Sequence, residues 1–479
     1  MHRKGAQSVG VWSFGTVARG EGALHHPIDD WVAVLFLLAY LLNFCEIALQ
    51  VKVKAMLIEF SVSNYRSIRD RQTLSLVANA GKELRESHVM PADAPNTPDL
   101  LRSVVLYGAN ASGKSSLLYA LLFVSDFVRN SASRSQPGDP IPYQPFAIAA
   151  AAGEASPCQF EVNFVQDGVR YQYGFAVTAQ TVVSEWLYAF PEGRQQTWFQ
   201  RRLVPETDTT QWEFGTNLRG QKKVWQEATR PNALYLSTAI QLNAEQLKPV
   251  FDWFTVTLRS ITPYARVNDA FTTRQCEKDA HWKARVLKFL SASDLGITDI
   301  HVDKHKFDPT SFDNSMPEPL RAYFAEQMKD SEIAEVRLTH RSSTGQILTL
   351  PLEEESGGTA KAYALAGPWI DVLTHGYTLI VDELDTSLHP QLLRHLVRLF
   401  NHPATNAKGA QLIFSTHDTT LLDTDLFRRD QIWFMEKDAE LASHLYPLTD
   451  FSPRKGENLE KGYLQGRYGA LPVFSARLE

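Results

Sequence analysis

A glycine-rich stretch at residues 108–116 reads GANASGKSS and carries the residue types that bind phosphate. Gly108 and Gly113 allow backbone N–H groups to close around an anion. Lys114 adds a mobile positive charge for the β and γ phosphates, and the Ser115 hydroxyl is suited to ligate Mg²⁺. A bare glycine-rich turn would not explain Lys114. The pattern predicts a nucleotide-binding loop made of Gly108, Ala109, Asn110, Ala111, Ser112, Gly113, Lys114, Ser115 and Ser116.

A pair of carboxylates, Asp382 and Glu383, follows the apolar run 379–381. Ligands of open α/β sheets bind at the carboxyl ends of the strands, so this pair is well placed for chemistry. Asp382 is suited to hold Mg²⁺ through water, and Glu383 to orient or polarise an attacking water. An acidic pair at a strand end is common by chance, so its weight comes from the motifs around it.

The elements that must position these residues are readable from periodicity. The run 103–107 (SVVLY) is nearly all apolar, as in a parallel strand buried on both faces. Leucines at helical spacing follow the glycine loop, and the positive end of that helix points at the same anion. Strands are also expected at 377–381 and 411–415, alternating with helices at 360–373 and 390–400. This order predicts an α/β fold with a mostly parallel central sheet.

Hairpins and a mixed lobe complete the expected organisation. The runs 159–165 and 169–177 flank a Gln-Asp-Gly turn, and 335–340 with 346–350 form a second expected hairpin. An alternating strand begins at Met56. Helical patches are expected at 242–254, interrupted by proline, at 281–290 and at 317–328. We expect four parts: a leader (1–55), the N-terminal half of a nucleotide-binding head (56–190), an inserted lobe (191–330) and the C-terminal half of the head (331–479).

The leader contains an apolar run of 15 residues, Trp31 to Cys45. A membrane span needs about 20 residues, so the run is short for that purpose. A membrane anchor, an apolar helix, and a translated segment upstream of a true start at Met56 are the three readings. We favour the last, and we expect no membrane contact.

Charge and cysteine content exclude several classes of protein. The chain of 479 residues has 48 Lys and Arg against 54 Asp and Glu, and its net charge of −6 gives no global attraction for nucleic acid. Cys45, Cys158 and Cys276 lie far apart, which excludes a disulfide framework and a four-cysteine zinc site. With 44% hydrophobic residues the chain is not disordered. We expect a cytoplasmic protein.

Further motifs resemble those of ABC-type ATPase heads. The SGGT sequence at 356–359 resembles their signature loop, Asp385 their D-loop aspartate, and His417 their switch histidine. The opening FSVSNYRSI (60–68) and the late YLQGRYGALP (463–472) resemble bacterial AAA ATPases with ABC-type heads. These ATPases occur in abortive-infection and other anti-phage systems, and they are related to the SMC, RecF and overcoming-lysogenization ATPases.

The resemblance implies ATP and Mg²⁺ as cofactors and an ATP hydrolase with Glu383 and His417 as catalytic residues. It also implies nucleotide contacts by Ser356, Gly357, Gly358 and Asp385. In such heads the signature of one subunit faces the nucleotide loop of another, which implies a homodimer or higher homo-oligomer. Gln144 is a candidate for sensing Mg²⁺, with a bland loop residue as the alternative. Glu355 stands where leucine begins the fuller signature, which is a departure from the family pattern.

Three functions fit these features. The first is an ATPase sensor or regulator that controls a separate effector, such as a nuclease or Toprim-like protein, in antiviral defence. The alternative is a DNA-repair ATPase of the SMC/RecF kind that acts on DNA directly. A nuclease with its own Toprim domain is disfavoured, because too few residues follow His417. Tyr463, Arg467 and Tyr468 would contact nucleic acid by stacking and charge, or would pack the tail on the head.

Overall fold

A computed structural model gives the fold and describes residues 55–148, 156–261, 269–292, 296–306, 317–328, 332–454 and 456–472. Within these ranges, every helix is too short or too polar to cross a bilayer. The apolar run 31–45 and the rest of the expected leader up to residue 54 lie outside the described residues.

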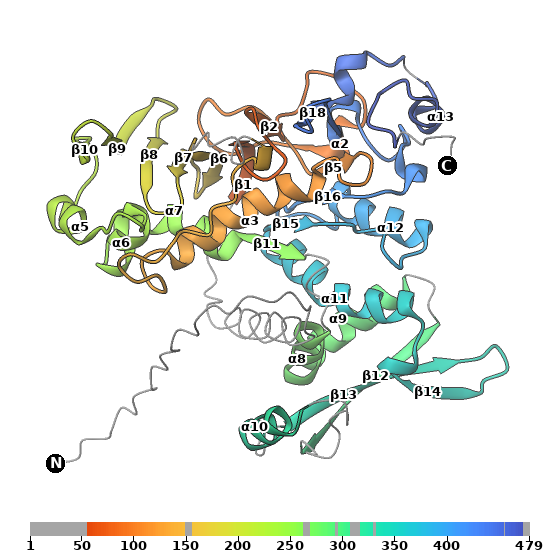
Figure 1. The fold of residues 1–479 in the computed structure, drawn as a ribbon. Helices are drawn as coiled ribbons and strands as arrows, with labels where there is room; N and C mark the ends of the chain where they lie inside the picture. The colour runs from red at the N-terminus through yellow and green to blue at the C-terminus, as the bar shows by residue number, and fades with distance from the viewer. Residues whose placement is uncertain are drawn as a thin grey trace, which may run out of the picture. The chain divides into compact units, whose positions relative to one another are not determined.

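A largely parallel sheet forms the centre of the fold (Figure 1). Its strands run in the order β11-β15-β16-β5-β17-β18, and only β18 is antiparallel to its neighbour. The expected strands at 103–107, 377–381 and 411–415 are confirmed here. The bounds are β5 (Ser103–Tyr107), β11 (Leu258–Ile261), β15 (Thr378–Val381), β16 (Gln411–Ser415), β17 (Ile432–Lys437) and β18 (Ser443–Pro447).

Helices cover both faces of this sheet, which explains why β5, β15 and β16 are buried along their whole length. In β15, Ile380 packs into the cluster that contains α3, whereas Leu379 and Val381 pack into the cluster that contains α11 and α12. The covering helices are α3 (Lys114–Asn130), α11 (Gly357–His375) and α12 (Pro390–Asn401). The last two confirm the helices expected at 360–373 and 390–400.

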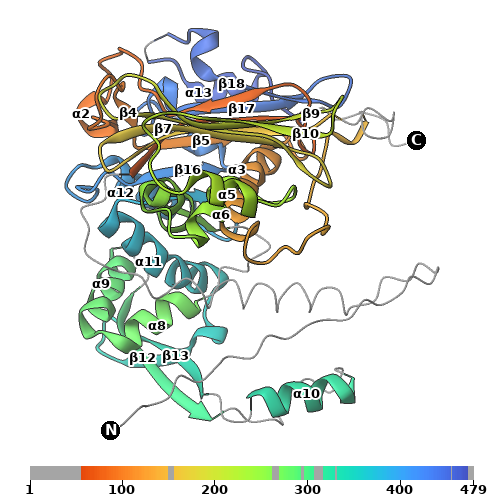
Figure 2. The ribbon, with the colours of Figure 1, turned by 90° about the vertical axis from the view of Figure 1, so that its left-hand side faces the viewer.

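An antiparallel sheet packs on α3 in the same core cluster as residues of the central sheet. Figure 2 shows it as a layer above α3, α5 and α6. Its order is β10-β9-β8-β7-β6-β1-β2. The expected β6–β7 hairpin is confirmed, with Asp167 and Gly168 both at positive φ, as a tight hairpin turn requires. The bounds are β1 (Ala55–Ser63), β2 (Gln72–Ser75), β6 (Cys158–Gln166), β7 (Val169–Val177), β8 (Val182–Phe190), β9 (Gln196–Val204) and β10 (Thr209–Phe214).

A separate small sheet, β12-β13-β14, lies beside helices that pack on α11. The pair β13 and β14 confirms the second expected hairpin, and α9 and α10 confirm the helices expected at 281–290 and 317–328. The bounds are β12 (Ile297–Lys306), β13 (Glu332–Arg341), β14 (Ile347–Pro351), α8 (Ala270–Lys278), α9 (Ala280–Ser291) and α10 (Glu318–Met328). The division of the chain into an inserted lobe at residues 191–330 stays a prediction. Three strands from the first half of this lobe belong to the two large sheets: β9 and β10 to the antiparallel sheet, and β11 to the central sheet.

The single helical patch expected at 242–254 is wrong in form. The chain there makes a short 3₁₀ turn, η1 (Glu245–Leu247), then α7 (Lys248–Asp252), then a π-helical turn, η2 (Trp253–Thr257). Pro249 lies in the first turn of α7, where its missing N–H has no helical partner to lose. The proline therefore starts a new helix instead of interrupting an old one.

Short elements connect these layers. They are α2 (Arg85–His88), β3 (Val89–Met90), β4 (Leu100–Leu101), α5 (Lys222–Ala228), α6 (Tyr235–Gln241), η4 (Leu352–Glu354), η5 (Thr419–Leu421), η6 (Arg429–Gln431), η7 (Leu448–Phe451) and α13 (Leu459–Leu464).

Candidate nucleotide site

The glycine-rich loop joins β5 to α3, in the strand–loop–helix order expected from the sequence. Gly113 caps α3 with φ 113°, and Gly108 has φ 156°. A Cβ at Gly108 would lie 2.3 Å from the Met435 carbonyl oxygen, and one at Gly113 would lie 2.2 Å from Ser443 Oγ. Neighbouring strands therefore press on both glycines, and Gly113 also has a backbone conformation that side chains disfavour.

Lys114 is folded into this loop and is only 5% exposed. Its Nζ donates to the carbonyl oxygens of Gly108, at 2.8 Å, and Ala109, at 3.1 Å. Burial lowers the pKa of Lys114, and the negative charges of Asp382, Glu383 and Asp385 oppose that shift. The ammonium group is thus held beside the acidic end of β15.

One serine at the end of β16 holds the carboxylate of Asp382 and the backbone of Glu383. Ser415 Oγ donates to Asp382 Oδ1 at 2.5 Å and accepts from the backbone N–H of Glu383 at 2.8 Å. Asp382 is 5% exposed, and Glu383 has φ 53°. A left-handed conformation at a residue other than glycine is strained and needs support from its surroundings. Ser415 supplies that support.

The predicted D-loop aspartate and switch histidine lie next to this pair. The backbone N–H of His417 donates to Asp385 Oδ1 at 3.2 Å, and the N–H of Leu384 donates to the Ser415 carbonyl at 3.1 Å. The pKa of His417 is lowered, first by partial burial of the ring and then by the positive charge of Lys114, and nearby carboxylates oppose this. The imidazole of His417 therefore lies close enough to Lys114 for the two groups to face the same part of the site.

The predicted signature lies at the start of α11, where Ser356 and Gly357 are exposed and Thr359 is buried. Ser356 caps the helix, since its Oγ accepts from the N–H of Thr359 at 3.1 Å. A Cβ at Gly357 would meet nothing within 4 Å, whereas one at Gly358 would lie 3.2 Å from the Ser387 carbonyl oxygen. The helix start thus rests on the D-loop of its own chain and leaves Gly357 facing open space.

Gln144 is placed differently from the other predicted residues. Its Oε1 accepts from Arg66 Nε at 2.6 Å, and its carbonyl oxygen accepts from the Arg66 N–H at 2.8 Å. The Arg66 guanidinium lies 4.7 Å from the centre of the Tyr119 ring. The structure thus ties Gln144 to the NYRSI segment, and its role toward Mg²⁺ stays a prediction.

Sequence reasoning missed several residues that hold the site together. Lys361, on α11, donates through Nζ to the carbonyl oxygens of Leu384, at 3.2 Å, and Thr386. Ser67 of the NYRSI segment donates to Ser116 Oγ at 3.0 Å. Ser443 lies 2.8 Å from Ser67 and donates to the Ser112 carbonyl at 2.7 Å. Lys361 could have been found from its place within one helical turn of the predicted signature, whereas no pattern in the sequence indicates a role for Ser415 or Ser443.

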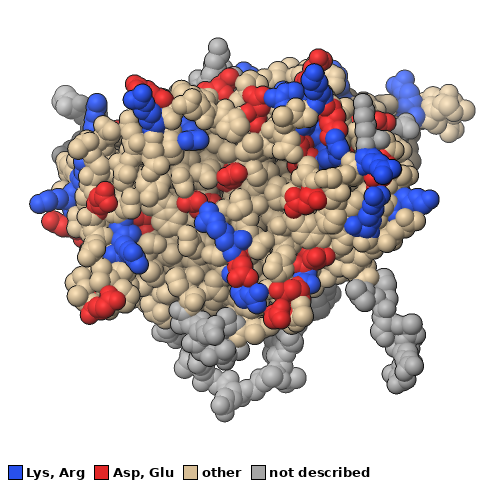
Figure 3. All heavy atoms as spheres, turned by 90° about the horizontal axis from the view of Figure 1, so that it is seen from above, with Lys and Arg blue, Asp and Glu red and all other residues tan. Residues whose placement is uncertain are grey.

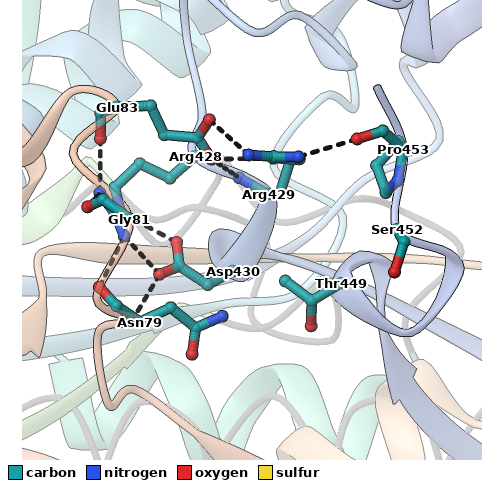
Figure 4. Close-up of a pocket in the computed structure, with 9 residues that line it drawn as sticks. All are labelled: Asn79, Gly81, Glu83, Arg428, Arg429, Asp430, Thr449, Ser452 and Pro453. Atoms are coloured by element: carbon teal, nitrogen blue, oxygen red, sulfur yellow. Dashed lines mark hydrogen bonds and ion pairs between the residues drawn. The ribbon is translucent and has the colours of Figure 1, made fainter. Parts of the chain in front are cut away.

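A polar pocket of about 300 Å³ lies elsewhere and contains none of the predicted site residues. Arg428 binds Asp430 and the carbonyl oxygens of Asn79, Gly81 and Glu83, as Figure 4 shows. Arg429 pairs with the Glu83 carboxylate and the Pro453 carbonyl. The pocket lies where three chain segments meet, and with both guanidinium groups engaged it offers no spare positive charge to a ligand.

The chain was compared with known proteins. Residues 103–423 match a family model described as "AAA domain, putative AbiEii toxin, Type IV TA system". The match covers the nucleotide loop, the acidic pair and His417. The chain belongs to this AAA domain family.

No curated protein matches this AAA domain. Among solved structures, the SMC head domain from Thermotoga maritima is similar at 11% identity and TM-score 0.37, covering 82% of this chain and 98% of that one. The Smc head domain from Pyrococcus furiosus, solved with the C-terminal domain of ScpA, has 12% identity and TM-score 0.37, with coverages of 86% and 99%. The recombination mediator RecF bound to ATP has 11% identity and TM-score 0.31, with coverages of 76% and 93%. These TM-scores are too low for the likeness to bear on function.

Proposed function

We propose that this AAA domain binds ATP with Mg²⁺ and hydrolyses it. The observation that carries the proposal is the gathering of Lys114, Asp382, Glu383 and His417 at the ends of β5, β15 and β16, where hydrogen bonds tie the acidic pair to Ser415 and the His417 backbone to Asp385. The carboxylates of Asp382 and Glu383 act on the pKa of both Lys114 and His417, which agrees with this placement. Groups with opposed charges that perturb one another at the carboxyl end of a parallel sheet are typical of a catalytic site. The family membership agrees with this choice.

Each residue has a distinct part in this reaction. Lys114 and the backbone of the glycine loop hold the phosphates, while Ser115 and Asp382 hold Mg²⁺, which when bound neutralises charge on the phosphates. Glu383 orients the attacking water, and His417 contacts the γ-phosphate. Ser415 keeps Asp382 and Glu383 at the required separation without touching the nucleotide.

We further propose that a second copy of the chain completes the site. Ser356 and Gly357 are exposed at the start of α11, and their own chain leaves room around Gly357. A nucleotide held by Lys114 of one subunit and read by Ser356 of another would stabilise the dimer, and loss of the γ-phosphate would loosen it.

The output we propose is regulation of a separate effector, such as a nuclease or Toprim-like protein, in anti-phage defence. The family description names a toxin–antitoxin system, which agrees with a partner protein and does not identify the effector. Direct action on DNA is the alternative. The one face drawn in Figure 3 intersperses positive and negative side chains, and the rings of Tyr463 and Tyr468 are buried, so neither feature supports a contact with DNA.

The test measures ATP binding and Mg²⁺-dependent phosphate release. Lys114→Ala should weaken binding, and Glu383→Gln should keep binding and lose turnover by about a thousandfold or more. Lys223→Ala and Glu227→Gln, on the exposed surface of α5, are matched controls and should behave as the parent. Turnover by Glu383→Gln at the parent rate would overturn the role given to Glu383.

A further inference from the structure

The C-terminal segment 457–470 forms a close-packed element that the proposed reaction leaves without a role. We call residues 457–470 the C-terminal latch. Tyr463 and Tyr468 stack on Phe434 of β17, with ring centres at 5.4 and 5.8 Å. Both tyrosines are buried, at 5% and 1% exposure. The tail therefore packs on the head, and stacking of these rings on nucleic acid would require leaving the core.

Two glycines let the latch lie this close. A Cβ at Gly462 would be 2.8 Å from the Tyr468 hydroxyl, and one at Gly469 would be 2.6 Å from both Glu436 Oε2 and the Tyr446 hydroxyl. The Tyr468 hydroxyl in turn donates to Glu457 at 2.8 Å. Fixed contacts of this kind make the latch a rigid support.

The latch reaches the loop that carries the switch histidine. Glu460 Oε1 accepts from Thr419 Oγ1 at 3.0 Å. The Tyr107 hydroxyl donates to the Asp418 carbonyl at 3.0 Å, and the Tyr107 ring lies 5.8 Å from that of Tyr463. Asp418 and Thr419 directly follow His417. The Tyr107 bond therefore holds the backbone next to His417, and the Glu460 bond holds the side chain of the residue after it.

Tyr107 also adjoins the nucleotide loop. It is the last residue of β5 and directly precedes Gly108. One buried tyrosine thus joins the strand that carries the phosphate loop to the loop that carries His417. The His417 ring is only partly buried and its N–H is bonded to Asp385, so the bonds made by Asp418 and Thr419 are the next contacts that hold this loop.

We propose that Tyr107 and Glu460 are positioning residues that aim His417 at the γ-phosphate, with the C-terminal latch as their support. This rests on the proposed ATPase function. It gives the YLQGRYGALP motif a mechanical role in the nucleotide site in place of a nucleic-acid contact.

The first test reads the contact itself, in the full chain without nucleotide. Amide hydrogen exchange of residues 416–421 should be about three- to tenfold faster in Tyr107→Phe and in Glu460→Ala, each of which loses one hydrogen bond. Glu460→Gln keeps an acceptor for Thr419 and should restore protection. Tyr463→Phe loses only a bond to the Ala470 carbonyl and should leave residues 416–421 unchanged. Unchanged exchange in both Tyr107→Phe and Glu460→Ala would overturn the proposal, whether or not the protein hydrolyses ATP.

The second test reads the catalytic consequence. Tyr107→Phe and Glu460→Ala should each lower kcat about three- to tenfold with little change in KM. In a His417→Ala background neither should lower kcat further, because the residue they position is gone. Additive losses in that background would overturn the positioning role. A parent chain without ATPase activity would instead refute the proposed function, and the exchange test would still decide the latch contact.

Discussion

The candidate site has two regions that are built in different ways. Around Lys114 and Asp382 the side chains are buried and bonded to other parts of the same chain. Around Ser356 and Gly357 the helix start is exposed, and a Cβ would find open space. The first region is held by contacts within one subunit, whereas Ser356 and Gly357 in the second are exposed, and no described residue lies within 4 Å of a Cβ placed at Gly357. This difference is what an interface-completed site would show, and the following experiments break or sharpen it.

The largest effect is expected from mixing two inactive variants. Lys114→Ala destroys the buried region and Ser356→Arg blocks the exposed one, so each alone should lose hydrolysis. In an equal mixture that exchanges subunits, half of the dimers should be mixed, each with one intact site, which gives about a quarter of the parent activity. Phosphate release and sizing check this together.

A strictly cooperative pair of sites would give no rescue. Measuring the size of Glu383→Gln in saturating ATP distinguishes that case, because a cooperative pair of sites still requires a dimer. A monomer there, together with no rescue, contradicts the interface.

The buried region should not tolerate a methyl group at Gly113. Gly113→Ala combines a positive φ with a Cβ placed 2.2 Å from Ser443 Oγ. Gly138→Ala is a matched control, since Gly138 also has positive φ but nothing within 4 Å. We expect Gly113→Ala to cost about 1–3 kcal/mol more than the control in free energy of unfolding, and to lose ATP binding. Equal costs would mean that Ser443 moves aside freely.

Loss of the Ser415 hydroxyl should affect turnover more than binding. Ser415→Ala removes an acceptor from the Glu383 N–H and a donor to Asp382, both in a buried setting. We expect about a tenfold fall in kcat, the scale of one or two such hydrogen bonds. Ser415→Thr keeps the hydroxyl and should retain more activity. A kcat for Ser415→Ala equal to that of the parent would show that backbone strain at Glu383 is held by other contacts.

The smallest effect concerns pH. The pKa of His417 is lowered from the ordinary histidine value of about 6.5. As the pH falls, its ring therefore stays neutral to a lower pH than an ordinary histidine does. If neutral His417 is the active form, kcat/KM, which reports the free enzyme, should fall only below that value. Asp385→Asn removes a charge that raises this pKa, so the acid limb should move to still lower pH. His417→Ala should lack the limb, and a limb that survives there belongs to another group.

Much of the fold was predictable because it depends on local patterns. The strands β5, β15 and β16 each have an apolar centre and are buried throughout, and α12 begins at Pro390, a favoured first helical residue. The region near Pro249 was mispredicted, because its hydrophobic spacing fits one helix while the proline starts a new one. Gln144 was chosen for its distance along the chain, and the structure bonds it to Arg66, a partner that no local pattern indicates.

The sequence by itself determined the loop at 108–115, because glycines, lysine and serine at fixed spacing encode a local backbone shape and a charge. It also determined that Asp382 and Glu383 end a buried strand. Only the tertiary structure decided what holds these groups in place. Ser415 meets Asp382 because β15 and β16 pair in parallel with Val381 beside Phe414, and Ser443 meets Gly113 because β18 joins the same sheet. Such contacts depend on the register of strands far apart in the chain, and that register follows from burial of whole faces and not from any short motif.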